Sequence, residues 1–371
     1  MKKTILFLLI SMLLHAAPGA AESKVFSVTD EQNQPLFSIA GEVCIGDEYI
    51  SSANMLYRIT QVSGTQAQAM RIGEETMPDV GWLDAGQAQA VFSNLAVPAA
   101  SQKNDDKRKL IAMYVTHSDE SYVPSDGTQS IEGQGGIYDV ARAFRDSLQQ
   151  KGIDVILDES THLPHDSGAY RRSRRTAERL LQKRPDAIID IHRDGIPDPD
   201  EYVTKIEGEN ASKVRLLVGR SNQNSEVNRA FAKQLKAVAD KKYPGLIKDI
   251  FIGKGNYNQD LSPNAILLEF GTHTISKERV FQSTDVMADV VSTTLYGEQT
   301  GSTPSAQMAG NSAAKKEKNK GSFSGMALVI AIVVIGAILF ALMQTGSAKG
   351  AGRKIGRNIS EMTGGLFKKK N

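Results

Sequence analysis

The stretch Asp186-Ala-Ile-Ile-Asp-Ile-His-Arg-Asp-Gly195 decides the fold that we expect. It begins as an apolar, β-branched run, which is typical of a buried strand in a parallel sheet. It ends abruptly in His192, Arg193 and Asp194. Ligands of α/β folds bind beyond the carboxyl ends of the strands. We therefore expect His192 to lie at the mouth of a cleft, on a rigid support.

Strands and helices alternate on both sides of this stretch, over residues 109–297. Strands are expected at 110–115, 153–157, 187–191, 213–219 and 264–270, and helices at 137–150, 170–183, 225–242 and 278–296. The helices show apolar residues at helical spacing, as at Val227, Phe231 and Leu235. This alternation predicts an α/β domain whose largely parallel sheet is flanked by helices.

The N-terminal part of the chain has a different character. Residues 1–21 combine a basic start, a short apolar run and small residues, which predicts a secretory signal peptide. Residues 22–95 contain short β-forming runs separated by turn residues, and we expect a small β-rich accessory domain there. Residues 96–108 are polar and charged and predict a linker.

The C-terminal part predicts a membrane attachment. Residues 298–325 are rich in Ser, Gly, Ala and Lys, which is typical of a flexible tether. Residues 326–344 form the predicted transmembrane helix. Its apolar run Met326–Met343 would span roughly 27 Å, close to the ~30 Å of a bilayer core. The basic residues 345–371 predict a cytoplasmic tail, and the signal peptide then places the body outside the membrane as a single-pass protein of the cell membrane.

Composition excludes some classes of protein. The chain has 371 residues and a formal net charge of +2, so no strong basic field points to nucleic acid as a partner. Cys44 is its one cysteine, which rules out a disulfide within the chain. The lone thiol lies between two apolar residues and is most simply a small buried side chain.

Histidines gather at the predicted strand ends. Of the six in the chain, His15 lies in the predicted signal peptide and the others lie in the α/β part. His117, His192 and His273 each follow a strand, and parallel strands bring such ends to one edge. Two imidazoles and a carboxylate are a standard ligand set for catalytic zinc, which activates a water molecule. A second carboxylate then serves as general base and proton donor.

Several choices stay open at this point. An isolated histidine after a strand often only caps the strand or makes a hydrogen bond. The carboxylate ligand is either Glu120, three residues after His117, or Glu132, just before the first helix. The segment His162-Leu-Pro-His165 is either a second metal pair or a loop with structural or substrate contacts. The arginine-rich helix at 170–183 is either a solvated face or a surface for acidic peptide stems.

Five motifs together resemble one known family. They are Tyr114-Val-Thr-His-Ser-Asp-Glu-Ser-Tyr122, His165-Asp166, Arg171–Arg175 with Ser173, Asp190-Ile-His-Arg-Asp194 and Leu267-Leu-Glu-Phe-Gly271. In this order they resemble the stage II sporulation protein P family, which is similar to zinc-dependent N-acetylmuramoyl-L-alanine amidases. The resemblance covers about residues 108–296, and the motif around His192 is its most specific part.

The resemblance implies an activity and a site. The activity is hydrolysis of the amide between the lactyl group of N-acetylmuramic acid and L-alanine, which releases stem peptides from peptidoglycan. Some family members also cut peptide cross-links. The implied zinc ligands are His117, Glu120 and His192, and Glu269 is the general acid/base. The implied partners are peptidoglycan, the cytoplasmic membrane, and other cell-wall hydrolases or sporulation proteins.

The chain departs from the family pattern in two respects. The membrane segment follows the enzyme domain, whereas family members usually place it ahead. The family usually has His-Thr-His where this chain has Val115-Thr116-His117, and we expect the second histidine to be the ligand. A lost ligand at Val115 would instead leave a non-catalytic amidase-like domain that binds peptidoglycan or a partner protein. A third alternative is a metallopeptidase that acts on another amide.

Overall fold

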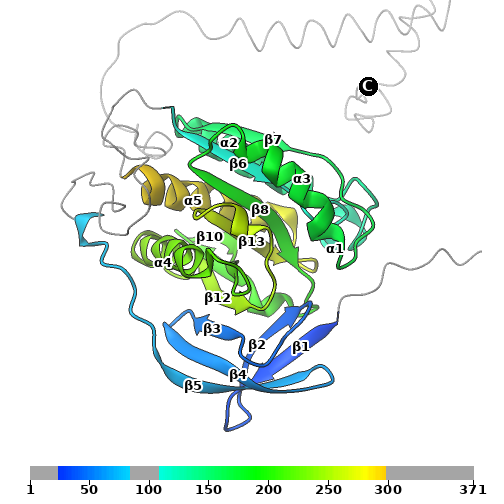
Figure 1. Ribbon diagram of the computed structural model, residues 1–371, viewed down its shortest axis with the longest axis vertical. Helices are drawn as coiled ribbons and strands as arrows, with labels where there is room; N and C mark the ends of the chain where they lie inside the picture. Colours follow the sequence, from blue (N-terminus) through cyan, green and yellow to red (C-terminus); the bar gives the residue numbers. More distant parts are fainter. Residues whose placement is uncertain (1–23, 84–107, 298–371) are drawn as a thin grey trace, which may run out of the picture. The chain divides into compact units, whose positions relative to one another are not determined.

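The computed structural model describes residues 24–83 and 108–297. Its centre is an 11-stranded mixed sheet with the order β2-β1-β5-β4-β3-β12-β11-β13-β8-β6-β7 (Figure 1). The strands of this sheet are β1 (Val25–Thr29), β2 (Pro35–Ala40), β3 (Glu48–Ser51), β4 (Met55–Ser63), β5 (Gln66–Glu74), β6 (Leu110–Tyr114), β7 (Asp154–Asp158), β8 (Ala187–Asp194), β11 (Val214–Gly219), β12 (Ile247–Gly253) and β13 (Ala265–Thr272). A separate hairpin consists of β9 (Val203–Ile206) and β10 (Glu209–Ser212).

The longer helices agree with the sequence-based expectations. They are α2 (Ile137–Gln150), α3 (Ala169–Leu181), α4 (Ser225–Lys242) and α5 (Lys277–Tyr296), and one short helix, α1 (Val123–Asp126), precedes them. Short 3-10 turns are η1 (Gly81–Leu83), η3 (Pro199–Glu201) and η4 (Gln259–Leu261). The five strands predicted in the α/β part are present as β6, β7, β8, β11 and β13, whereas β12 and the hairpin were not predicted.

The prediction of a largely parallel sheet is wrong. Strands β6, β7, β8 and β13 run parallel, but β11 pairs with β13 in the antiparallel sense. Parallel neighbours need a long crossover, usually a helix. The β9–β10 hairpin, not a helix, lies between β8 and β11 in the chain, so β11 enters the sheet reversed. The helix α4 then connects β11 to its parallel neighbour β12.

The N-terminal strands continue the same sheet, which corrects the expected β-rich domain ahead of it. Strand β3 pairs antiparallel with β12, from Ser51 opposite Asp249 to Glu48 opposite Ile252. Behind this seam, Phe37 and Phe251 belong to one apolar cluster. The edge of β12 is therefore covered by β3, which satisfies hydrogen-bonding groups that an exposed edge would leave unpaired.

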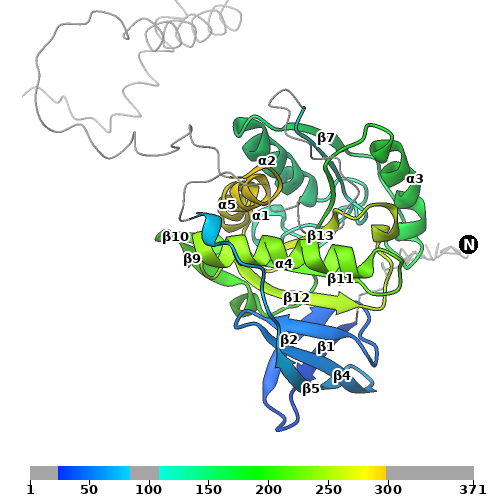
Figure 2. The same cartoon turned by 60° about the vertical axis from the view of Figure 1, so that its left-hand side comes forward.

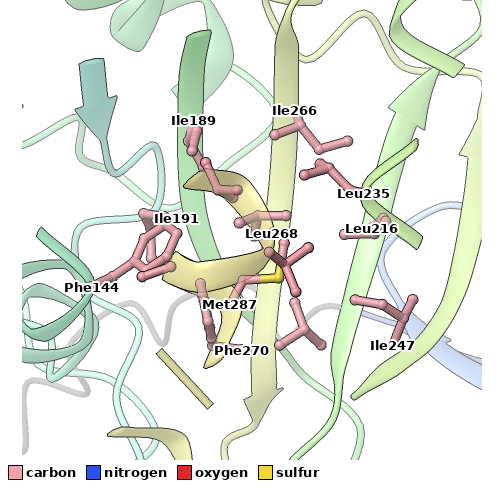
Figure 3. Packing of buried hydrophobic residues seen from close by; sticks show 14 of the residues in the cluster. Phe144, Ile189, Ile191, Leu216, Leu235, Ile247, Ile266, Leu268, Phe270 and Met287 are labelled. Carbon is pink, nitrogen blue, oxygen red and sulfur yellow. The ribbon is translucent and has the colours of Figure 1, made fainter. Parts of the chain in front are cut away.

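The two faces of the sheet are covered differently. Helices α2, α4 and α5 pack on one face over the main core, in which Ile191, Leu268 and Leu216 come from neighbouring strands (Figure 3). Figure 2 shows α4 lying along β11 and β12. The opposite face carries α3, with Ala177 and Leu180 against Ile188.

Side chains alternate between the faces along a strand. Asp190 and His192 therefore share the face of Ile188, and Glu269, which pairs with His192, points the same way. Leu267 on this face belongs to the cluster of the N-terminal strands. His192 thus emerges between α3 and those strands.

The predicted terminal segments and most of the predicted linker lie outside the described residues. They are the signal peptide (1–21), most of the linker (96–108), the tether (298–325), the membrane segment (326–344) and the tail (345–371). Among the helices in residues 24–83 and 108–297, none combines the length and apolar character needed to cross a membrane.

Candidate active site

Three predicted ligands come together at the carboxyl end of β8. His117, Glu120 and His192 each offer one potential ligand atom, and these atoms lie within 4.8 Å of one another. Glu120 Oε1 lies 3.2 Å from His117 Nδ1 and 3.5 Å from His192 Nδ1. Within residues 24–83 and 108–297, no other group of His, Cys, Asp and Glu side chains has this metal-binding geometry. The carboxylate thus lies between two imidazoles.

Asp190 on strand β8 accepts two hydrogen bonds from the loop after β6. Its Oδ1 accepts the Thr116 N–H at 2.9 Å, and its Oδ2 accepts the Thr116 hydroxyl at 2.6 Å. Strands β6 and β8 are adjacent and parallel, so the two strand ends lie side by side. Because Thr116 precedes His117 and Asp190 lies two residues before His192, this contact sets the distance between the two histidines.

The Glu120 carboxylate is held by backbone contacts as well. Its Oε2 accepts the Arg193 N–H at 3.0 Å. The Arg193 guanidinium donates to the carbonyls of Ser121 at 3.0 Å and Gln129 at 2.7 Å, which fastens the loop around Glu120. A Cβ at Gly135 would lie 2.3 Å from the Glu120 carbonyl oxygen, so only glycine fits there.

The electrostatics of the three residues favour a bound cation. Burial lowers the pKa of His117, which keeps its imidazole neutral. Burial opposes ionisation of Glu120, but the neighbouring His192 and His117 hold the pKa of this carboxyl well below its usual range. Burial likewise opposes charge on His192, yet Asp190 and Glu120 raise the pKa of His192 well above its usual range. The two carboxylates therefore favour positive charge at His192, which either a proton or a metal ion supplies.

The residues fit a metal ion. His192 Nδ1 lies 3.5 Å from Glu120 Oε1, on the side of the ligand group, whereas Nε2 lies 3.1 Å from Asp190 Oδ1. Two imidazoles and one carboxylate, with the carboxylate of Asp190 behind His192, are the donor set of a catalytic zinc site.

Glu269 lies beside this group. It occupies β13 at the position paired with His192 on β8, and its residue is 7% exposed. Its Oε2 accepts the Tyr202 hydroxyl at 3.3 Å and lies 3.7 Å from Arg215 Nη1. Burial, and next the charge of Asp194, raise the pKa of Glu269 to about 8. A carboxyl with such a pKa can hold a proton at neutral pH, which suits proton transfer.

The remaining predicted residues are placed as follows. Glu132 is exposed and lies outside the metal-binding group, so the structure brings Glu120 to the histidines. Val115 is buried in the main core, and its carbonyl accepts a hydrogen bond from His162 Nδ1 at 2.8 Å. His162 also contacts Thr176 Oγ1 at 2.9 Å and is a structural residue. His273 follows β13, outside the group of three.

Sequence reasoning missed a second histidine–carboxylate pair beside the site. The His165 ring stacks on the His117 ring with centroids 3.9 Å apart. His165 Nδ1 lies 2.9 Å from Asp119 Oδ1, and the Ser130 hydroxyl donates to Asp119 Oδ2 at 2.7 Å. The segment His117-Ser-Asp119-Glu120 was the available signal in the sequence. Two carboxylates follow one histidine there, so one of them was left to pair with a second histidine.

The arginines of α3 are mostly engaged within the molecule. Arg172 pairs with Asp166, Arg174 with Asp260, and Arg179 with Asp158. Ion pairs at this level of exposure contribute little stability. They nevertheless engage three of the five arginines that this helix offers to acidic ligands.

Comparison with known proteins identifies the family. The stage II sporulation protein P model matches residues 46–292, and the chain belongs to this family. It is 29% identical over 238 residues to stage II sporulation protein P of Bacillus subtilis strain 168, which covers 59% of this chain. The chain spans 58% of the length of that relative. The family predicted from the motifs is thus confirmed.

The solved structures that this chain matches include two amidases. One is an N-acetylmuramoyl-L-alanine amidase of Nostoc punctiforme, 15% identical, with a TM-score of 0.34, covering 50% of this chain and 94% of that chain. The other is an N-acetylmuramoyl-L-alanine amidase from Clostridium difficile 630, 13% identical, with a TM-score of 0.33, covering 50% of this chain and 92% of that chain.

Proposed function

We propose that the protein is a zinc-dependent peptidoglycan hydrolase, an N-acetylmuramoyl-L-alanine amidase that releases stem peptides during cell-wall remodelling in sporulation. One observation carries this proposal: His117, Glu120 and His192 meet at a strand end, with buried Glu269 on the neighbouring strand. Membership in the stage II sporulation protein P family supports the sporulation setting.

The residues divide the chemistry between them. His117, Glu120 and His192 would hold the zinc ion, which when bound polarises the amide carbonyl and acidifies water. The ionised form of Glu269 takes the proton of the attacking water, and the protonated carboxyl then passes this proton to the leaving nitrogen. Arg193 keeps Glu120 in place through its backbone N–H.

The position of Val115 supports the catalytic proposal over the non-catalytic alternative. That alternative assumed a ligand lost at this position. The Val115 side chain is fully buried in the main apolar core, on the side away from His192. A histidine there is not needed to complete the group formed by His117, Glu120 and His192.

We further propose that the enzyme is tethered to the cell membrane and acts outside the cytoplasm on peptidoglycan. This part rests on the N-terminal sequence 1–21 and on the apolar C-terminal stretch 326–344. Contacts with other hydrolases or sporulation proteins stay a prediction from family membership.

The test uses purified sacculi and metal analysis. The wild-type protein is expected to bind about one zinc per chain and to release stem peptides, whereas His192→Ala loses both. Glu132→Gln is the matched control, because Glu132 is exposed and outside the site. Unchanged release by His192→Ala would contradict the proposal. Mass analysis of digested muropeptides distinguishes cleavage of the lactyl amide from cleavage of a peptide bond.

A further inference from the structure

A row of charged side chains crosses the sheet next to the site. His192 pairs with Glu269, Glu269 with Arg215, and Arg215 with Asp249, on the successive strands β8, β13, β11 and β12. Paired residues on adjacent strands point to the same face. The row therefore runs from the candidate metal ligand directly to Arg215, whose side chain is 0% exposed.

The Arg215 guanidinium is fully engaged. Its Nε and Nη2 donate to the two oxygens of Asp249 at 2.7 and 3.0 Å. Its Nη1 donates to Asp194 Oδ2 at 2.8 Å and lies 3.7 Å from Glu269 Oε2. Its Nη2 also donates to the Ser38 carbonyl at 3.0 Å. A buried charge persists only with such partners, and the planar fork of arginine serves several of them in fixed directions.

The N-terminal strand β2 completes this arrangement. The Ala40 N–H donates to Asp194 Oδ1 at 3.0 Å, and the Ser38 carbonyl accepts from Arg215. The Tyr202 hydroxyl joins the other side, since it lies 2.9 Å from Asp194 Oδ2 and 3.3 Å from Glu269 Oε2. The backbone of β2 thus contacts Asp194 and Arg215, and Arg215 in turn lies next to Glu269.

We propose that Arg215 is a positioning residue for Glu269, and that the β2 backbone at Ser38 and Ala40 belongs to the same positioning unit. The inference rests on the proposed function, because it assigns the support of the proton-transferring carboxyl. The N-terminal strands are in this view a part of the catalytic unit, not an accessory to it. A lysine at 215 would keep the charge but lose the fork that orients Asp194 and Glu269 together.

The test compares Arg215→Lys with Arg229→Lys. Arg229 on α4 also holds the N-terminal strands, through Glu48 at 2.6 Å and Glu75 at 2.6 Å, but neither of these two carboxylates belongs to the row that includes Glu269. We expect Arg215→Lys to lower kcat on a soluble muropeptide by about 10- to 100-fold, since small misplacements of catalytic groups cost that much. The KM and the zinc content stay unchanged. Arg229→Lys lowers the melting temperature and leaves kcat unchanged.

A second readout does not depend on turnover. The infrared carboxyl band of Glu269 is identified by its loss in Glu269→Gln. It is expected to shift in Arg215→Lys and to stay in place in Arg229→Lys. If Arg215→Lys does not fold, Tyr202→Phe takes its place and shows a smaller change of the same kind, because Tyr202 contacts the same two carboxyls.

The outcomes separate this inference from the proposed function. A folded Arg215→Lys variant with wild-type kcat and an unshifted band would overturn the inference while the amidase assignment stands. A wild-type protein that takes up zinc but releases no stem peptide would overturn the assignment. The infrared comparison then still decides whether Arg215 positions Glu269.

Discussion

Glu269 and His192 occupy paired positions on the adjacent parallel strands β13 and β8. Their side chains leave the same face of the sheet, so a carboxyl of raised pKa stands next to a candidate metal ligand. The spacing between them is set by the sheet and not by a loop, which is the kind of support that a catalytic pair requires.

Removing the carboxylate between the two histidines is expected to remove the metal. Glu120→Gln keeps the shape of the side chain but loses the charge that faces His117 and His192. We expect zinc affinity to fall by more than about 100-fold, since changes behind the ligands already cost about 10- to 100-fold. Titration with zinc in the presence of a competing chelator measures it. Glu132→Gln serves as the control, and equal affinities in the two variants would show that Glu120 is no ligand.

Asp190 is expected to raise the affinity for zinc without being a ligand of the ion. Its carboxylate holds Thr116 and faces His192 Nε2. Asp190→Asn should weaken zinc binding by about 10- to 100-fold. Asp158→Asn, at the end of the outer strand β7, should leave it unchanged, because Asp158 pairs with Arg179. Isothermal titration calorimetry compares the two, and identical affinities would argue against a supporting role.

Glu269→Gln is expected to abolish turnover and to change the pH dependence of stability. Burial, and next Asp194, raise the pKa of Glu269 from 4.5 to about 8. Between these values the folded state keeps a proton that the unfolded chain releases, so wild-type stability falls as pH rises. The metal-free Glu269→Gln variant does not lose stability in this way as pH rises. Its melting temperature should therefore exceed that of the wild type increasingly from about pH 5 to about pH 8; a shrinking difference would contradict the assignment.

Glu75 is expected to stabilise the fold above its titration range. Burial opposes its ionisation, but hydrogen bonds from Lys233 and Arg229 outweigh burial and lower the pKa of Glu75. A lowered pKa adds stability at neutral pH that is lost as pH falls through the folded value. Glu75→Gln should lower the melting temperature at pH 7 by about 2–4 °C per kcal/mol lost. Its exposed neighbour is the control: Glu74→Gln should have no effect, and the Glu75 difference should vanish in acid.

Much of the local structure could be predicted. The run from Ala187 to Ile191 is apolar and β-branched, so its strand follows from its own residues. The helices α2 and α4 follow from apolar residues at helical spacing. The polar residues after the strands likewise identified His117 and His192, and the family resemblance identified Glu269, before any contact between them was known.

The direction of β11 and the attachment of β3 were not predictable in this way. A strand has the same residue pattern in either direction, and its direction depends on the connection before it. The β9–β10 hairpin takes the place of the expected crossover helix. This replacement becomes visible only in the tertiary structure. The residues of β12 likewise do not indicate that β3 pairs with the edge of this strand.

The sequence by itself determined the α/β character, the family and the strand end that carries His192, because these depend on residues close together in the chain. The tertiary structure alone decided that Glu120, not Glu132, faces the histidines. It also decided that Arg215 lies behind Glu269 with Asp249 and the β2 backbone around it. Such a buried charge can be understood only with its distant partners in place, since burial without them would be prohibitively unfavourable.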